Sequence, residues 1–188
     1  MLVEANVRQN ILRYCILDSD YHTAEQIQQR KEEATAKGIN LHIWSLKEIE
    51  NYLIIPEIIR DMILDRIDTG KRRPTLVEIE NRIFETSEQM KNDVLDAYSS
   101  EFYAQNRASG IAAANAAARA VVDEKWNQAT TRLAIVSGKN VLSKLSEWSQ
   151  MEFGVSLSAI RIAQRMTAPH LPKELVDVIG AIENNQPF

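Results

Sequence analysis

Cysteine is nearly absent from this sequence, which has one thiol, Cys15, among 188 residues. A single cysteine excludes an internal disulfide and is typical of a protein kept in a reducing compartment. No apolar run approaches the roughly 20 residues that a membrane-spanning helix needs. The first ten residues, MLVEANVRQN, also contain no apolar core of a signal peptide. These absences predict a cytoplasmic protein without a membrane segment.

Two common kinds of catalytic motif are missing as well. Ser137-Gly138-Lys139 is followed by Asn140 and lacks the upstream glycine of a phosphate-binding P-loop, which excludes an ATP-binding loop of that type. No Ser/His/Asp or Cys/His set has the character of an activated nucleophile. Any chemistry in this chain should therefore depend on other residues.

Excess positive charge is the next feature that the chain lacks. The net charge of −4 argues against indiscriminate binding of nucleic acid. Residues 1–70 hold twelve Asp/Glu against eight Lys/Arg, whereas residues 107–165 hold eight Lys/Arg against four Asp/Glu. This distribution is compatible with a metal site beside a phosphate-binding face, and equally with two ordinary solvated surfaces.

The front of the chain has the pattern of a strand, a helix and a second strand. Residues 11–17 form an apolar run that ends in Asp18-Ser19-Asp20, as expected for a buried strand with an acidic tip. Thr23-Ala24-Glu25-Gln26 matches a helix capping box, and Gly38 suits the left-handed residue that ends a helix. The alternating residues 39–44 should form the second strand. Such a unit predicts parallel strands with a right-handed crossover.

The rest of the chain is expected to be mainly helical. An amphipathic helix led by Pro56 should run to about Ile67, and apolar spacing predicts helix from Thr75 to about Arg132, interrupted at Ser109-Gly110. The later elements expected are a short strand at 133–136 and helices at 140–152, 156–166 and 173–183. The chain thus divides into an α/β part, 1–70, and a mainly helical part, 71–188, whose short strand completes the domain.

Two aspartates directly follow the first strand. Asp18 and Asp20 are two residues apart, so in an extended chain both carboxylates point to one side, at the sheet edge where α/β proteins bind ligands. Paired carboxylates repel each other, and a hard cation such as Mg²⁺ or Mn²⁺ relieves that repulsion. The alternative is that Asp20 caps a turn while Asp18 is a solvated loop residue.

Glu48 and Glu50 follow the second strand in the same way. Neighbouring parallel strands end at one edge, about 4.8 Å apart, so this pair can reach the aspartates. Four convergent carboxylates could bridge the two metal ions of a phosphoryl-transfer site. Alternatively, one glutamate faces solvent and the other caps the helix led by Pro56.

Together these segments resemble a known family. The elements that carry the resemblance are Ile16-Leu17-Asp18-Ser19-Asp20-Tyr21, a polar helix, His42-Ile43-Trp44, and Lys47-Glu48-Ile49-Glu50-Asn51-Tyr52-Leu53 with Pro56. They resemble the topoisomerase–primase (Toprim) domain of OLD-family nucleases, which follows an ABC-type ATPase. The resemblance covers residues 10–60 and is only general beyond Thr75. It implies an α/β fold with a partial Toprim-like parallel sheet and a large helical C-terminal portion.

The resemblance also implies a function and its residues. Asp18 and Asp20 correspond to the family's metal-binding aspartates, and the resemblance implies Glu48 and Glu50, in its glutamate-rich element, as further metal-binding residues. Lys139 corresponds to a functional lysine late in such domains, where it can neutralise charge on a phosphate oxygen. The alternative, from the residues alone, is an exposed surface lysine without a function. Members of the family cut nucleic acid with Mg²⁺, and many act in phage defence or DNA repair.

Two parts of the family pattern are not found in this sequence. A complete domain opens with a strand that leads to a glutamate several dozen residues before the aspartates, whereas only nine residues precede Asn10. The ATPase is not part of the chain either. The expectation is therefore a module that depends on an ATPase region or a partner protein.

Two functions from different classes remain. The first is a Mg²⁺- or Mn²⁺-dependent DNA endonuclease module, with Glu48 as ligand or base and Lys139 at the scissile phosphate. The second is a non-catalytic scaffold with a degenerate Toprim core, whose helices after Thr75 bind a partner or form a homo-oligomer. A primase or topoisomerase fragment would share the metal site but lacks a nucleophilic tyrosine or zinc-ribbon context.

Overall fold

The front of the chain forms a βαβ unit in the computed structural model, which describes residues 12–188. β1 (Arg13–Leu17) and β2 (Ile39–Ile43) pair in parallel, in register from one end to the other. α1 (Ala24–Ala36) connects them and packs on the sheet. The prediction of two parallel strands joined by a helix is confirmed, and within the described residues these two strands make up the whole sheet.

Local signals set both ends of α1. The Thr23 hydroxyl accepts a hydrogen bond from the Gln26 backbone N–H, and the Gln26 side chain accepts one from the Thr23 N–H, which completes the expected capping box. At the other end Gly38 adopts φ 67°, a backbone conformation that favours glycine. The chain then turns directly into β2.

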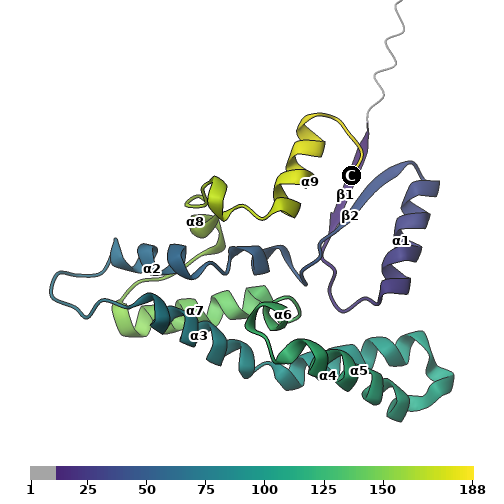
Figure 1. Ribbon diagram of the computed structural model, residues 1–188, viewed down its shortest axis with the longest axis horizontal. Coiled ribbons are helices and arrows are strands. Elements are labelled where there is room, and N and C mark those ends of the chain that lie inside the picture. The colour runs from purple at the N-terminus through teal and green to yellow at the C-terminus, as the bar shows by residue number, and fades with distance from the viewer. Residues whose placement is uncertain (1–11) are drawn as a thin grey trace, which may run out of the picture.

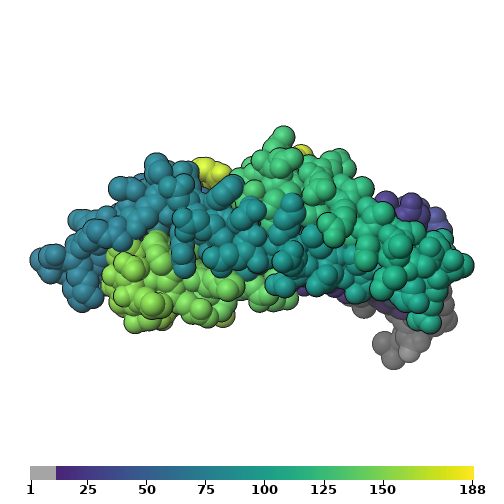
Figure 2. Space-filling view, turned by 90° about the horizontal axis from the view of Figure 1, so that it is seen from below, coloured from purple at the N-terminus to yellow at the C-terminus, as the bar shows by residue number. Residues whose placement is uncertain are grey.

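Helices make up most of the remaining chain. Their bounds are α2 Pro56–Leu64, α3 Leu76–Glu88, α4 Lys91–Gln105, α5 Gly110–Trp126, α6 Ala129–Leu133, α7 Gly138–Phe153, α8 Ala159–Ala163 and α9 Lys173–Glu183, with 3₁₀ turns η1 Ile49–Leu53, η2 Arg107–Ser109 and η3 Ala168–His170. The strands, α1 and α9 lie on one side of the molecule, and α3 to α7 form an elongated layer along the other (Figure 1). Seen from the side of that layer, its helices make up most of the visible surface (Figure 2).

The main hydrophobic core lies within the helices. Fully buried side chains from α2, α3 and α7 meet there, among them Ile59, Ile79 and Leu145. α2 precedes residue 70 in the sequence but packs with the helices that follow it, so this core crosses the division expected at residue 70. Trp44, Tyr52 and Val178 form a second, small cluster between the β2 end and α9.

The prediction of a strand at 133–136 is wrong. α6 ends at Leu133, and the next residues form a turn in which the N–H groups of Ile135 and Val136 both donate to Arg132 O (3.0 and 3.2 Å). Both side chains are buried in the main core. The apolar run therefore reflects burial of a turn whose carbonyl groups accept hydrogen bonds from Lys47 and Asn51, and it pairs with no strand that the structure describes.

Several helix limits also differ from expectation. The predicted break at Ser109-Gly110 is confirmed, but a second break at Gln89–Met90 separates α3 from α4. The helix predicted over 156–166 is only α8, whereas α9 has the predicted limits. Short breaks such as Gln89–Met90 contain neither glycine nor proline, so local sequence gives little sign of them.

Candidate functional site

The loops that follow β1 and β2 run side by side at the carboxyl edge of the sheet. The Trp44 N–H donates to Leu17 O (3.1 Å), and the Asp20 N–H donates to Lys47 O (3.1 Å). The Ser19 hydroxyl also donates to Leu46 O (2.9 Å). These bonds hold the two acidic loops together, as the parallel topology predicts.

Asp18 and Asp20 lie at this edge, but not as an extended pair. β1 ends at Leu17, and Asp20 has a left-handed backbone with φ 47°. The alternation argument is therefore incorrect, because the chain turns between the two residues. Asp18 accepts a hydrogen bond from the Ile49 N–H (3.2 Å), and its other oxygen lies 3.5 Å from Lys139 Nζ.

Glu48 is buried and joins the β2 loop to the start of α7. Its carboxylate receives hydrogen bonds from Lys47 Nζ (2.5 Å), the Lys139 backbone N–H (3.0 Å) and the Ser137 hydroxyl (3.1 Å to Oε2). Burial opposes its ionisation, but the Lys139 N–H and Lys47 outweigh that effect and hold the pKa of Glu48 below its ordinary value. A general base needs a free lone pair and a pKa near the working pH, so this geometry favours an anchoring role for Glu48.

Glu50 and Lys139 face each other across the same edge. Lys139 Nζ lies 3.9 Å from Glu50 Oε2, a buried oxygen that has no hydrogen-bond partner. The Lys139 side chain is 56% exposed. Burial works against its charge, but Glu50, Glu48 and Asp18 raise the pKa of Lys139 above the ordinary lysine value. Lys139 is therefore a permanent cation and not a proton acceptor at neutral pH.

Two residues with central positions were not singled out by the sequence. Lys47 is buried, with Nζ between Glu48 and Asp20 (3.6 Å to Asp20 Oδ1). The Asn51 side chain donates to Leu133 O and Val136 O (2.7 and 2.9 Å) and accepts from the Glu48 N–H (2.9 Å). The sequence contains one indication that Lys47 and Asn51 are important, which is that both lie inside the glutamate-rich element 47–53.

Gly138, the first residue of α7, lies directly against Asn51. A Cβ at position 138 would lie 2.6 Å from the Asn51 backbone N and 2.9 Å from its side-chain Cγ. We expect Gly138→Ala to lower the free energy of unfolding by about 1–3 kcal/mol, the usual cost of overpacking. Urea unfolding followed by circular dichroism measures the change.

Gly180 in α9 is the matched control for this substitution. A Cβ there meets nothing within 4 Å, and alanine in a helix is more stable than glycine by about 0.5–1 kcal/mol. Gly180→Ala should therefore raise the stability. Equal effects of the two substitutions on stability would show that a Cβ at position 138 fits beside Asn51 without strain.

The donor chemistry of this edge suits Mg²⁺ or Mn²⁺, but the carboxylates do not form a ready-made site. Asp18, Asp20 and Glu50 offer oxygen ligands, and the unpartnered buried oxygen of Glu50 is one that a cation could satisfy. Within residues 12–188, however, no three Asp, Glu, His or Cys side chains are grouped closely enough to hold a metal ion. Lysine ammonium groups lie among the acids instead.

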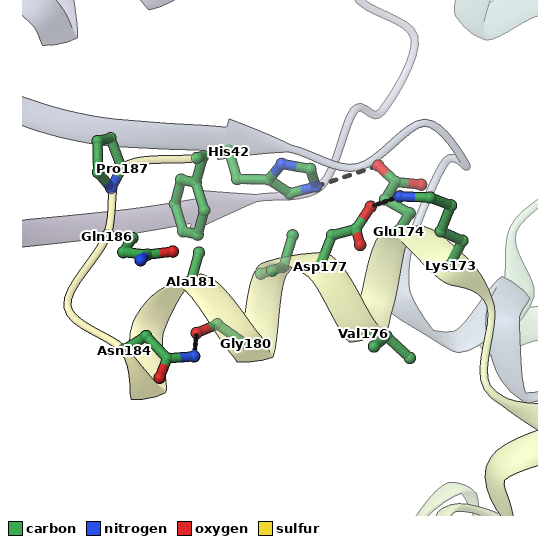
Figure 3. Close-up of a pocket in the computed structure, with 12 residues that line it drawn as sticks. His42, Lys173, Glu174, Val176, Asp177, Gly180, Ala181, Asn184, Gln186 and Pro187 are labelled. Carbon is green, nitrogen blue, oxygen red and sulfur yellow. Dashed lines mark hydrogen bonds and ion pairs between the residues drawn. The ribbon is translucent and has the colours of Figure 1, made fainter.

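A pocket of about 770 Å³ lies elsewhere, between α9, the end of the chain and β2 (Figure 3). His42 points toward it from β2 and hydrogen-bonds Glu174 of α9 (3.1 Å). Glu174 also accepts from the Ser45 N–H (2.9 Å) and from the Tyr52 hydroxyl. Burial and this bond raise the pKa of Tyr52 to about 12. These polar groups attach α9 to β2 and to the segment that follows it.

Comparison of the chain with protein-family models, curated proteins and solved structures finds no match. None of the helices in the part of the chain that the structure describes is long and apolar enough to cross a membrane.

Proposed function

We propose that this chain is a Mg²⁺- or Mn²⁺-dependent nucleic-acid cleavage module with DNA as its substrate. The observation that supports this proposal is the contact between three distant segments at one sheet edge. Asp18 follows β1, Glu48 and Glu50 follow β2, and Lys139 lies in the first turn of α7. The Lys139 ammonium lies 3.5 Å from Asp18 and 3.9 Å from Glu50, and its backbone N–H donates to Glu48 (3.0 Å). Carboxylates beside an exposed cation are the groups that phosphodiester chemistry uses.

Each part of this edge has a distinct role in the proposal. Lys139, exposed and permanently charged, binds a non-bridging phosphate oxygen and stabilises the charge that develops on it. Asp18, Asp20 and Glu50 are the residues that would hold the cation, which when bound supplies an activated water and a Lewis acid. Glu48 fixes the β2 loop against α7, so that Lys139 and the acids keep their positions.

The partners in this proposal come from the resemblance to the OLD family. The chain would act in the cytoplasm with an ABC-type ATPase region or partner protein. In that assembly the partner would contribute the strand and the glutamate that open a complete Toprim domain.

A non-catalytic interaction module is the second candidate function. It is favoured by the pairing of acids with lysines, which makes the edge stable without a metal. It is also favoured by apolar side chains that are exposed on β1 and α9, namely Ile16, Leu17, Val176 and Ile179. In this reading the edge is structural, and these surfaces bind another protein.

Calorimetric titration with Mn²⁺ distinguishes the two functions. We expect weak binding by the wild-type chain and at least tenfold weaker binding by the double variant Asp18→Asn, Asp20→Asn, estimated from the roughly 10–100-fold effect of changes around metal ligands. Asparagine keeps the oxygen that accepts the Ile49 N–H, so the loop should keep its shape.

Asp96→Asn on the exposed face of α4 is the matched control, since it removes the same charge away from this edge. It should bind Mn²⁺ like the wild type. Equal heats from the wild type and the double variant would show that the aspartates are not ligands and would favour the interaction module.

A further inference from the structure

The Lys47 side chain is the most unusual charged group at the sheet edge. It is only 8% exposed, and its ammonium lies 2.5 Å from Glu48 Oε1 and 3.6 Å from Asp20 Oδ1. Nζ also lies 4.8 Å from the centre of the Tyr21 ring. A buried ammonium is costly unless it is paired, so these two carboxylates are the groups that keep Lys47 in place.

The backbone of Lys47 is held on both sides. Its N–H donates to Ala134 O (2.9 Å), and its carbonyl accepts from the Asp20 N–H (3.1 Å). Only the side chain is therefore able to leave the two carboxylates. Because the ammonium is tethered, its effective concentration at the two carboxylates is high.

We propose that Lys47 is an internal counter-ion, anchored by Glu48, that competes with the divalent cation for Asp20. This inference rests on the proposed function, in which a cation binds at this edge. A cation that uses Asp20 meets the Lys47 charge 3.6 Å from that carboxylate, so entry of the metal requires the ammonium to move away. Lys47 thereby sets the weak metal affinity of the free chain, and its displacement is linked to metal loading.

Thermal unfolding at increasing Mn²⁺ concentration tests this inference on the full chain. Lys47→Gln removes the charge but keeps an amide that can donate to Glu48. We expect its half-saturating Mn²⁺ concentration to fall by about tenfold relative to the wild type, as expected when a competing unit charge is removed. Lys47→Arg keeps the charge and should respond like the wild type. Lys31→Gln on the exposed face of α1 is the control for general charge loss.

A second measurement uses the wild-type protein, so it does not depend on how a variant folds. An amine-acetylating reagent followed by peptide mass spectrometry reports the accessibility of each lysine. Lys47 should be poorly acetylated alone and several-fold more acetylated with saturating Mn²⁺, whereas exposed Lys31 should not change.

The outcomes separate this inference from the proposed function. If Mn²⁺ stabilises the wild type and Lys47→Gln at the same concentration, and Asp18→Asn, Asp20→Asn removes the response, the metal site stands and the role of Lys47 is refuted. If Mn²⁺ affects neither the stability of any variant nor Lys47 acetylation, both are refuted. Tighter binding by Lys47→Gln in a chain that never cuts DNA would refute the nuclease function alone.

Discussion

Alanine at position 20 should abolish metal-dependent DNA cleavage by the assembly of this chain with its proposed ATPase partner. Asp20 is one of three acids available to hold the cation. Its side chain is 57% exposed, so alanine should cost only the roughly 1–2 kcal/mol of a left-handed residue at φ 47° and leave the fold intact. Lys139→Met should lower the rate by about 100-fold, the usual effect of removing one group that stabilises developing charge. A plasmid-cleavage assay with Mg²⁺ or Mn²⁺ measures both rates, with the neighbouring gene product as the candidate partner.

The chain alone should show little or no cleavage, because within residues 12–188 no three Asp, Glu, His or Cys side chains are grouped closely enough to hold a metal ion. Asp96→Ala on α4 is the control and should cut like the wild type. If the assembly cuts DNA equally well after Asp18→Ala and after Asp20→Ala, these acids are structural and the interaction module is the better explanation. Efficient, Asp20-dependent cutting by the chain alone would show that no partner is needed.

Glu48→Ala should lower the free energy of unfolding by about 3–5 kcal/mol, the usual cost of removing one partner of a buried ion pair. The substitution leaves the Lys47 ammonium buried, with Asp20 at 3.6 Å as its remaining carboxylate contact. It also removes the acceptor of the Lys139 N–H at the start of α7. Urea unfolding at pH 7 measures the loss.

The pH dependence of this loss follows from the lowered pKa of Glu48. A carboxyl with a depressed folded-state pKa contributes its stability fully above its unfolded value of 4.5, and loses it as the pH falls through the folded value. The difference between wild type and Glu48→Ala should therefore be largest near neutral pH and shrink below pH 4.5.

Glu147→Ala is the matched control for Glu48→Ala, because Glu147 is an exposed acid on α7, the helix whose start Glu48 anchors. It should change the stability by less than about 0.5 kcal/mol. A loss that is equal for the two variants, or one for Glu48→Ala that does not vary with pH, would show that the ion pair with Lys47 does not stabilise the fold.

The sequence by itself determined the elements that local chemistry specifies. The capping box at Thr23, the left-handed residue Gly38 and the period-two pattern of β2 were sufficient for the βαβ unit. The parallel topology then required the loops after β1 and β2 to meet at one edge, which is why Asp18 could be expected near the Glu48 loop.

Only the tertiary structure decided how those acids are paired. The two contacts between Asp20 and Lys47 and the contact of Gly138 with Asn51 depend on segments far apart in the sequence. The run at 133–136 shows the same limit, because burial in a core produces an apolar pattern whether the backbone is a strand or a turn. Helix caps and side-chain periodicity are local to the sequence, whereas burial and charge pairing depend on which distant segments the fold brings together.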